Sequence, residues 1–326
     1  MIKFSSNLAR LLALGVLMAF AGAASAQQSY PVKPIRFIVP FPPGGSTDPL
    51  ARLVGQKLTE AWAQQVLVEN RPGGNTIIGT DAVAKSAPDG YTILLAASTH
   101  VINSLLIRNL PYDSIKDFAP VAMLIKSEFV LILHPAVPAN NLQEFIALAK
   151  STPGKLNYAT SGNGNPNHLA GEWFNMATGV KMQSVPYKGG GPAITDLIGG
   201  QVQAMFSVPV SVIPQIKAGK LKAIAVAGEN RLSSLPQVPT FAEAGLPGFD
   251  PKSWQGILAP AGTPRAVIDK LAAQISKILA QRDVSEKLAS QGTVPFFLGP
   301  DEFAALMQAD AARFAGVIKT ANIRLD

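Results

Sequence analysis

The chain of 326 residues contains no cysteine. This absence excludes disulfide bonds, thiol catalysis and metal sites with cysteine ligands, and it rules out a lipid anchor on an amino-terminal cysteine. Histidine is scarce as well, because the chain has only His100, His134 and His168, which are far apart and lack the spacing of metal ligands. We therefore expect no metal site and no bound cofactor.

Long apolar runs are missing after the amino-terminal segment, where no stretch reaches the roughly 18 apolar residues typical of a membrane-spanning helix. The segment itself combines Lys3 and Arg10 with an apolar run over 11–21 and then Ala24-Ser25-Ala26, which is the pattern of a secretory signal peptide. We expect residues 1–26 to be removed by cleavage after Ala26; an uncleaved membrane anchor is the alternative. With no cysteine for lipidation, this pattern predicts a periplasmic location in a two-membrane bacterium.

The common local signatures of catalysis are also missing. The chain has no G-x-S-x-G elbow, no H-E-x-x-H helix and no G-K-[S/T] phosphate loop, so no catalytic residue is expected. One enzymatic alternative stays open, a periplasmic hydrolase whose serine and histidine meet only in the folded chain.

The formal net charge of +7 comes from scattered lysines and arginines. This distribution argues against nucleic acid binding and is compatible with mild attraction of anions.

Strand-like and helix-like patterns alternate along the rest of the chain, which predicts an α/β fold with mostly parallel sheets flanked by helices. The expected strands lie near residues 35–40, 66–69, 91–96, 119–125, 129–134, 156–160, 202–206, 222–227 and 254–259, and the expected helices near 49–63, 76–87, 141–151, 166–178, 192–199, 264–280 and 301–319.

Two interruptions divide this alternation. Lys126-Ser127-Glu128 breaks the apolar segment 119–133, and a proline-rich stretch over 230–252 precedes another apolar strand. We interpret both as crossings between two lobes that are joined by a two-strand hinge. The expected division is a discontinuous first lobe of residues 27–127 and 248–326, with residues 128–247 inserted as the second lobe.

Two glycine-rich loops share one pattern: an apolar strand, the loop, an Asp or Asn that we expect to cap a helix, and a proline that begins the helix. Each loop places N–H groups and a positive helix end beyond the carboxyl end of a strand, where a carboxylate or phosphate oxygen is attracted. An ordinary strand–helix turn is the alternative. The candidate binding residues in these loops are Phe41, Pro43, Gly44, Gly45, Ser46, Thr47 and Asp48 in the first, and Ser161, Gly162, Gly164 and Asn165 in the second.

Other candidates lie next to the loops or at strand ends. His168, in the first helical turn after the second loop, is either a neutral ligand-binding residue or a packing residue, because a cation is disfavoured at a helix amino terminus. Ser98 and Thr99 follow the third expected strand, and Ser98 is either a ligand donor or a helix cap. Tyr187 offers a hydroxyl or a flat ring to a ligand. The glycine loop that follows it, residues 188–192, either lines a cleft or permits tight packing.

Short motifs, among them PFPPGGSTD at 40–48 and VPYKGGGP at 185–192, follow one another across nearly the whole chain after the signal peptide. In this order and spacing they resemble the Bug family, the periplasmic solute receptors of tripartite tricarboxylate transporters. The matching segments are residues 35–48, 69–74, 87–91, 110–113, 117–121, 157–159, 168–172, 185–192, 216–220, 238–240, 243–245 and 259–264.

The resemblance implies a two-lobed periplasmic-binding-protein fold of type II that closes on its ligand about a hinge. It implies a bound carboxylate, which is a tricarboxylate, a dicarboxylate, an acidic amino acid or an aromatic acid, held by loops 41–48 and 161–165, one from each lobe. Many members of the family carry an acidic or amide residue where this chain has Ser207, which makes Ser207 a further candidate and argues against an amino acid ligand. The implied partners are the carboxylate and the membrane permease subunits, with the receptor itself a monomer. A sensor that feeds a signalling kinase is the alternative to uptake.

Overall fold

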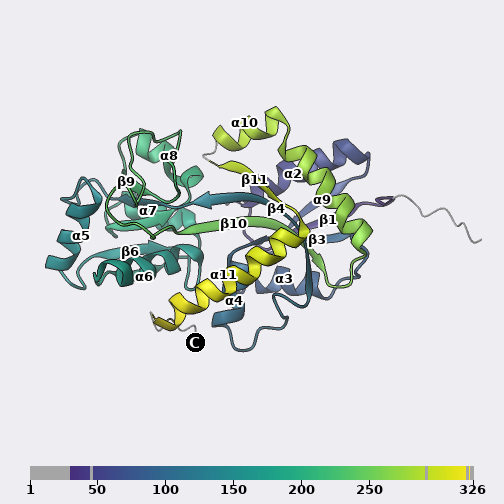
Figure 1. The fold of residues 1–326 in the computed structure, drawn as a ribbon, viewed down its shortest axis with the longest axis horizontal. Helices are drawn as coiled ribbons and strands as arrows, with labels where there is room; N and C mark the ends of the chain where they lie inside the picture. Colours follow the sequence, from purple (N-terminus) through teal and green to yellow (C-terminus); the bar gives the residue numbers. More distant parts are fainter. Residues whose placement is uncertain (1–29, 45–46, 291–292, 321–322, 324–326) are drawn as a thin grey trace, which may run out of the picture.

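The computed structural model describes residues 30–44, 47–290, 293–320 and 323. The expected signal peptide, residues 1–26, lies outside the described residues. Within them, no helix is both long enough and apolar enough to cross a membrane. Strands and helices alternate around two β-sheets, so the α/β fold expected from the sequence is confirmed (Figure 1).

The first sheet has the strand order β11-β4-β10-β3-β1-β2 and is covered by helices on both faces. Buried aliphatic side chains of α2, α9 and α10 pack on one face, and those of α3 and α11 pack on the other. The strands are β1 (Ile35–Val39), β2 (Val66–Asn70), β3 (Thr92–Ala97), β4 (Phe118–Glu128), β10 (Lys252–Pro260) and β11 (Val294–Leu298). The helices are α2 (Thr47–Trp62), α3 (Ile77–Ala84), α4 (Thr99–Leu106), α9 (Arg265–Leu279), α10 (Arg282–Ser290) and α11 (Pro300–Thr320). We call this unit the first lobe.

The second sheet has the order β7-β6-β8-β5-β9. Phe145 and Phe174, from α5 and α6, pack on one face, and Leu197 and Val212, from α7 and α8, pack on the other. The strands are β5 (Val130–Leu133), β6 (Asn157–Thr160), β7 (Gln183–Pro186), β8 (Ala204–Ser207) and β9 (Lys222–Val226). The helices are α5 (Leu142–Ser151), α6 (Pro166–Thr178), α7 (Gly190–Ile198) and α8 (Pro209–Lys217). We call this unit the second lobe.

Each sheet contains a central strand that runs against both of its neighbours. In the first sheet β10 is antiparallel to β3 and β4, whereas β2 and β3 are parallel to β1. In the second sheet β5 is antiparallel to β8 and β9, whereas β7 and β8 are parallel to β6. The sheets are therefore mixed rather than mostly parallel. The physical reason is that each sheet receives one strand from a chain that arrives from the other lobe.

The chain crosses between the lobes twice, from β4 to β5 and from β9 to β10 (Figure 1). Lys126-Ser127-Glu128 does not break the strand as expected, because β4 continues to Glu128 and pairs there with the start of β10. The strand continues through these polar residues because β10 pairs with all three of them and β11 also pairs with Lys126. The lobe boundaries after 127 and 247 remain predictions.

A small apolar cluster lies where the lobes touch. Ile102 and Leu106 of α4 pack with Leu169 of α6 and Phe314 of α11, and all four side chains are buried. The long helix α11 crosses from the first lobe toward α6 in Figure 1. Because burial of aliphatic surface is favourable, this cluster stabilises the observed arrangement of the two lobes.

Candidate functional site

The carboxyl ends of parallel strands bring the candidate residues together in each lobe. β1 and β3 are parallel neighbours, so Phe41 and Ser98, which follow them, lie at one edge of the first sheet. β6, β7 and β8 are also parallel, so Ser161, Tyr187 and Ser207 lie at one edge of the second. Ligands of α/β sheets bind at this kind of edge.

One hydrogen bond joins the two edges. Thr99 Oγ1, at the start of α4, donates to Oδ1 of Asn165, at the start of α6, over 3.2 Å. Both residues were selected from the sequence as binding candidates, although no contact between them was expected. The second loop is therefore held against the first lobe at the position proposed for the ligand.

Asp48 organises the first loop. Helix α2 begins at Thr47, one residue before Asp48, so the expectation that Asp48 caps this helix is wrong. Its Oδ2 accepts from the Gly44 N–H over 3.2 Å and from Arg52 Nε over 3.1 Å, and its Oδ1 accepts from Asn70 Nδ2 over 3.0 Å. Burial acts to raise the pKa of Asp48, but the hydrogen bonds from Arg52, Asn70 and Gly44 outweigh it and lower the pKa. Asp48 is thus an ionised group that connects Gly44 of the loop with Arg52 on α2 and Asn70 on β2.

Asn70 and Arg52 complete this network, and neither was predicted as a site residue. Asn70 Nδ2 also donates to the Phe41 carbonyl over 3.2 Å, and its Oδ1 accepts from Arg52 Nη2 over 3.0 Å. A signal for Asn70 was present in the sequence, because it ends β2 and therefore lies at the same sheet edge as Phe41. Arg52 carries no such signal, since it lies on a helix one turn beyond Asp48.

The rest of the first loop is only partly described, because Gly45 and Ser46 lie outside the described residues. Gly44 has a φ of +79°, a left-handed conformation that favours glycine. Its N–H is bonded to Asp48, so the ligand-directed N–H expected of Gly44 already has a partner. Thr47 is buried, Pro43 is exposed, and Phe41 is half-buried against the first-lobe core.

Side-chain amides close the second loop. Asn165 Nδ2 donates to the Ser161 carbonyl over 3.0 Å. Asn167 accepts from the Ser161 N–H over 3.3 Å and donates to Ser161 Oγ over 3.1 Å. Asn165 occupies the N-cap position of α6 as expected, but its side chain makes no capping hydrogen bond, because it contacts Ser161 and Thr99 instead. Pro166 has no N–H, and the N–H groups of His168 and Leu169 bond to the Asn165 carbonyl. The Asn167 N–H is therefore the one group at this helix end that has no partner among the described residues and is available to an anion.

Two glycines fix the backbone of this loop. Gly162 has a φ of +134°, and a Cβ atom there would lie 2.8 Å from Asn165 Nδ2. Gly164 has a φ of +72°, and its N–H donates to His168 Nδ1 over 3.1 Å. The conformation and the close approach both require glycine at position 162.

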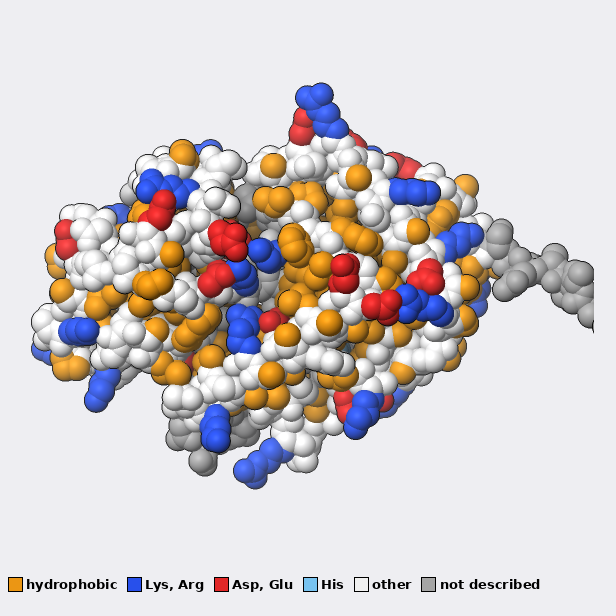
Figure 2. Space-filling model, viewed as in Figure 1, with side chains coloured by type: hydrophobic (Ala, Val, Ile, Leu, Met, Phe, Trp, Pro, Cys, Tyr) orange, Lys and Arg blue, Asp and Glu red, His pale blue; other side chains and the backbone are white. Residues whose placement is uncertain are grey.

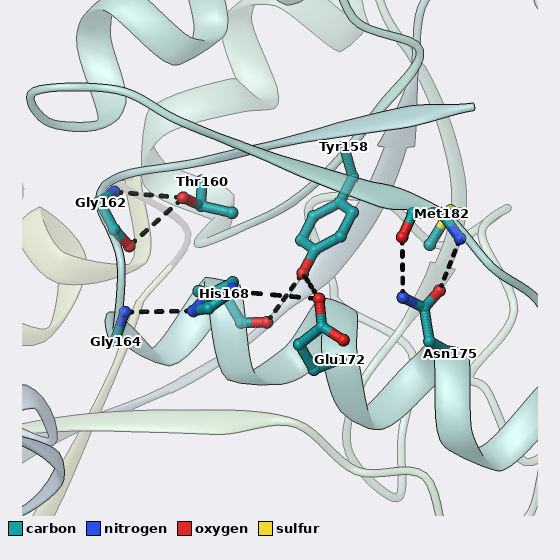
Figure 3. Close-up of polar contacts among 8 residues, drawn as sticks. All are labelled: Tyr158, Thr160, Gly162, Gly164, His168, Glu172, Asn175 and Met182. Carbon is teal, nitrogen blue, oxygen red and sulfur yellow. Dashed lines mark hydrogen bonds and ion pairs between the residues drawn. The ribbon is translucent and has the colours of Figure 1, made fainter. Parts of the chain in front are cut away.

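His168 is buried, and its ring contacts Gly164 and Glu172 (Figure 3). Because Nδ1 accepts from Gly164, the ring proton resides on Nε2, which lies 3.9 Å from Glu172 Oε1. Burial lowers the pKa of His168, and the nearby Glu172 only partly offsets this. Glu172 Oε1 also accepts from the Tyr158 hydroxyl over 2.6 Å. The lowered pKa favours the neutral imidazole, and the observed contacts are those of the packing alternative.

Ser98 is bonded to a crossing strand. Its Oγ accepts from the Trp254 N–H over 3.0 Å and lies 2.9 Å from Ser253 Oγ, both in β10. It occupies the N-cap position of α4 but makes no capping hydrogen bond, so the helix-cap alternative is wrong in that respect. Ser98 therefore ties the end of β3 to the strand that connects the lobes.

The remaining candidates lie at the second-lobe edge. Ser207 is buried at the end of β8, and its hydroxyl makes a long 3.4 Å contact with the Val208 carbonyl. Tyr187 is half-buried, and its N–H donates to the Thr160 carbonyl over 3.0 Å, which holds it beside the second loop. Burial, and then Asp196, raises the pKa of the Tyr187 hydroxyl, which therefore stays protonated at neutral pH.

The third glycine loop begins helix α7. Cβ atoms added at Gly189 and Gly191 would meet nothing within 4 Å, and one at Gly190 would lie 3.7 Å from Ser161 Oγ. Tight packing therefore does not explain these glycines, which favours the cleft-lining alternative. Gly189 alone requires glycine through its φ of +110°.

Charges on the crossing strands are paired. Figure 2 shows basic and acidic side chains next to one another on the surface between the lobes. Lys126 lies 3.4 Å from Glu128, and Lys252 forms an ion pair with Asp250. The positive charge of these strands is thus largely balanced locally.

The histidines form no metal site. His100 is buried in the first lobe, where its Nε2–H donates to the Ser114 carbonyl over 2.8 Å, and His134 Nδ1 accepts from the Ala136 N–H over 3.2 Å. Across the ranges that the structure describes, no group of three His, Cys, Asp or Glu side chains could hold a metal ion.

Comparisons with known proteins identify the family to which this chain belongs. The model of the tripartite tricarboxylate transporter family receptor, TctC, matches residues 50–323. Protein BugT of Bordetella pertussis is 39% identical over 324 residues, which cover 98% of this chain and 99% of BugT.

Two solved structures are similar over most of their length. R. palustris Rpa4515 with adipate is 33% identical, with a TM-score of 0.85 over 90% of this chain and 99% of that one. MatC of Rhodopseudomonas palustris with bound malate is 34% identical, with a TM-score of 0.80 over 89% and 100% of the two chains. The family consists of solute-binding receptors and not enzymes, so the hydrolase alternative is wrong. The chain belongs to the receptor family of tripartite tricarboxylate transporters, and the Bug-family resemblance of its motifs is confirmed.

Proposed function

We propose that this receptor captures a small organic acid between its lobes and delivers it to the permease of a tripartite tricarboxylate transporter. Loops 41–48 and 161–165 would hold the carboxylate, with Thr47, Ser161 and the uncapped amino end of α6 as donors. The observation that carries the proposal is the contact of Thr99 with Asn165, because it brings the candidate edges of both lobes to one place.

Hydrogen-bond donors and helix ends can supply the affinity without a free cation. A hydrogen bond to a charged group contributes about 1.5–3 kcal/mol, and a helix amino terminus contributes about 0.3–1 kcal/mol, or up to about 2 when partly buried. Four such contacts, less the cost of ordering the ligand, are compatible with about −8 kcal/mol, which corresponds to micromolar binding.

Similarity to receptors solved with adipate and malate supports a carboxylate as the ligand. The amino-terminal signal-peptide pattern and the periplasmic relatives support export to the periplasm, with cleavage after Ala26. Closure about β4 and β10 would then present the loaded form to the permease, with the receptor acting as a monomer.

Calorimetric titration and thermal melting with adipate, malate, citrate and benzoate test the proposal. A ligand at 100 times its dissociation constant adds about 2.7 kcal/mol to the stability of the folded state. We expect at least one acid to bind with a dissociation constant near micromolar and to raise the melting temperature. If none of these acids binds, and native mass spectrometry of the purified protein finds no retained acid, carboxylate capture is wrong.

A further inference from the structure

Gln255, on the crossing strand β10, has an unpaired amide oxygen and is among the residues that line a cavity. The residue is nine-tenths buried, with an exposed fraction of 7%. Its Oε1 is fully enclosed and has no hydrogen-bond partner among the described residues. Buried polar atoms are nearly always paired in folded proteins, so an unpaired amide oxygen at a cleft indicates a position that a ligand group completes.

The amide lines a small cavity that both lobes build. Leu50 comes from α2 of the first lobe, and Val208 and Val210 come from the second lobe. Gln255 and Ser127 come from the crossing strands β10 and β4. Closure of the lobes therefore determines whether this cavity exists at all.

The cavity adjoins the candidate site. Leu50 lies in the first turn of α2 after Asp48, and Val208 directly follows Ser207. Gln255 pairs with Ala97, the residue before Ser98. A ligand whose carboxylate contacts the two loops can thus direct its other end toward the Gln255 amide.

The side chains that line the cavity determine which chemical group the far end of the ligand can carry. The cavity wall is mostly aliphatic, its polar members are Ser127, Gln255 and Thr293, and no charged side chain contributes. A second carboxylate would be desolvated there without a partner of opposite charge, which is strongly unfavourable. The volume of about 10 Å³ suits one polar group of the size of a water molecule.

We propose that Gln255 is a specificity-determining residue that receives an uncharged hydroxyl group at the far end of a monocarboxylate ligand. A hydroxyl both donates and accepts, so it can pair with either end of the amide. This inference rests on the proposed function, and it narrows the ligand to hydroxy-substituted monocarboxylic acids over di- and tricarboxylates.

Calorimetric titration of the full chain with two matched sets of acids tests the inference. The first set is 4-hydroxybenzoate, benzoate and terephthalate; the second is 6-hydroxyhexanoate, hexanoate and adipate. We expect the hydroxy acid of at least one set to bind about 10-fold more tightly than its unsubstituted partner, which corresponds to about 1.4 kcal/mol, and more tightly than the diacid. A diacid that binds best in both sets overturns the inference.

The variant Gln255→Leu removes the amide and keeps a side chain of roughly similar volume. We expect the preference for the hydroxy acid to fall to about equal affinity in this variant, with circular dichroism and the melting curve used to verify that it folds. Gln308→Leu, at an exposed position of α11, is the matched control and should keep the preference. If Gln255→Leu does not fold, Gln255→Glu provides the second test, because it keeps an acceptor and should retain hydroxy-acid binding while further weakening that of diacids.

The outcomes separate the inference from the proposed function. If carboxylates bind but show no hydroxyl preference, or if the preference survives in Gln255→Leu, the role of Gln255 is wrong and carboxylate capture stands. If no acid of either set, nor malate or citrate, binds to the unmodified protein, the proposed function itself fails.

Discussion

Thr99 Oγ1 donates a hydrogen bond to Asn165 Oδ1 across the interface between the lobes. Helix α4 carries Thr99 at its first residue, and Asn165 precedes the first residue of α6, so the bond joins the amino ends of two helices. The buried side chains of Ile102 and Leu169 pack one turn further along the same helices. Any motion that separates the lobes would therefore break the polar contact and the apolar contact together.

The first prediction concerns this bond. Thr99→Val removes the hydroxyl and keeps the shape of the side chain. We expect ligand affinity to fall about 2- to 12-fold, because a neutral hydrogen bond contributes about 0.5–1.5 kcal/mol and this one joins the two lobes between which the ligand is proposed to bind. Calorimetric titration measures the change. Ser104→Ala, which removes a hydroxyl bonded within α4, is the control and should leave ligand affinity unaltered. Equal losses of affinity in both variants would contradict a role of the Thr99–Asn165 hydrogen bond in binding.

The second prediction concerns Asp48. Asp48→Asn should lower the free energy of unfolding at pH 7 by about 1–3 kcal/mol, because hydrogen bonds to a charged acceptor are lost at a nearly buried site. The pKa of Asp48 is lowered in the folded protein, so its stabilisation is complete above the unfolded pKa of about 3.9 and is lost as the pH falls further.

Urea unfolding at pH 7 and at pH 3 measures this effect. The difference between the original protein and Asp48→Asn should shrink at the lower pH. Asp269→Asn interrupts an exposed ion pair with Arg265 and should cost less than about 1 kcal/mol at either pH. A similar loss of unfolding free energy in Asp48→Asn and Asp269→Asn would show that the hydrogen-bond network of the first loop does not depend on the charge of Asp48.

The third prediction concerns His100, which is buried with its Nδ1 unpaired among the described residues. Burial lowers the pKa of His100 to about 4. The unfolded chain takes up a proton near pH 6.5 and the folded chain does not, so stability is complete above pH 6.5 and falls as the pH decreases toward 4. The loss attributable to this residue is about 3 kcal/mol across that window.

Thermal and urea unfolding between pH 4 and 7.5 measure the effect of His100. His100→Phe keeps the aromatic packing against Phe118 and should unfold with a weaker pH dependence than the original protein. An unchanged pH dependence would place the titration elsewhere in the chain.

The fourth prediction concerns the second loop. Gly162→Ala should lower affinity strongly, because the added Cβ would lie 2.8 Å from Asn165 Nδ2 and would displace the residue that contacts Thr99. Gly179→Ala is the matched control, since Gly179 also has a positive φ but an added Cβ there meets nothing within 4 Å. We expect the control to lose about 1–2 kcal/mol of stability and no affinity. Retained binding in Gly162→Ala would count against the second loop.

Much of the fold was predictable from local patterns. The helices at α2, α6 and α9 carry aliphatic residues at helical spacing, and the strands at β1, β3 and β10 are apolar runs bounded by glycine and proline. The two loops were predictable because glycine, an Asp or Asn, and proline succeed one another at strand ends. The two crossings were also expected, although their effect on strand direction was not.

Elements without such patterns were missed. α8 contains Pro214 and several β-branched residues, which disfavour a helix in isolation. β7 and β11 are edge strands whose side chains are partly exposed. β7 has no continuous apolar run, and β11 is apolar but contains Pro295, which disfavours a strand. Tertiary contacts determine these elements, because only a neighbouring strand or core supplies their partners.

The networks of the site were unpredictable for a similar reason. The sequence predicts Asp48 as a helix cap because it lies between a glycine-rich loop and a proline. In the structure its hydrogen-bond partner Asn70 lies on the next strand. The sequence likewise predicts Asn165 as a helix cap, whereas its hydrogen-bond partner Thr99 belongs to the other lobe. A single sequence does not reveal which distant side chain completes such a pair.

The placement of β10 has a consequence for how the chain acquires its structure. β10 spans Lys252–Pro260 but lies between β3 and β4, whereas every strand of the second sheet comes from residues 130–226. A polypeptide that emerges amino end first from a ribosome or an export channel can therefore finish the inserted sheet while β3 and β4 still expose unpaired edges. Such edges are sites of aggregation, so chaperones should be needed most during the interval before residue 260 emerges.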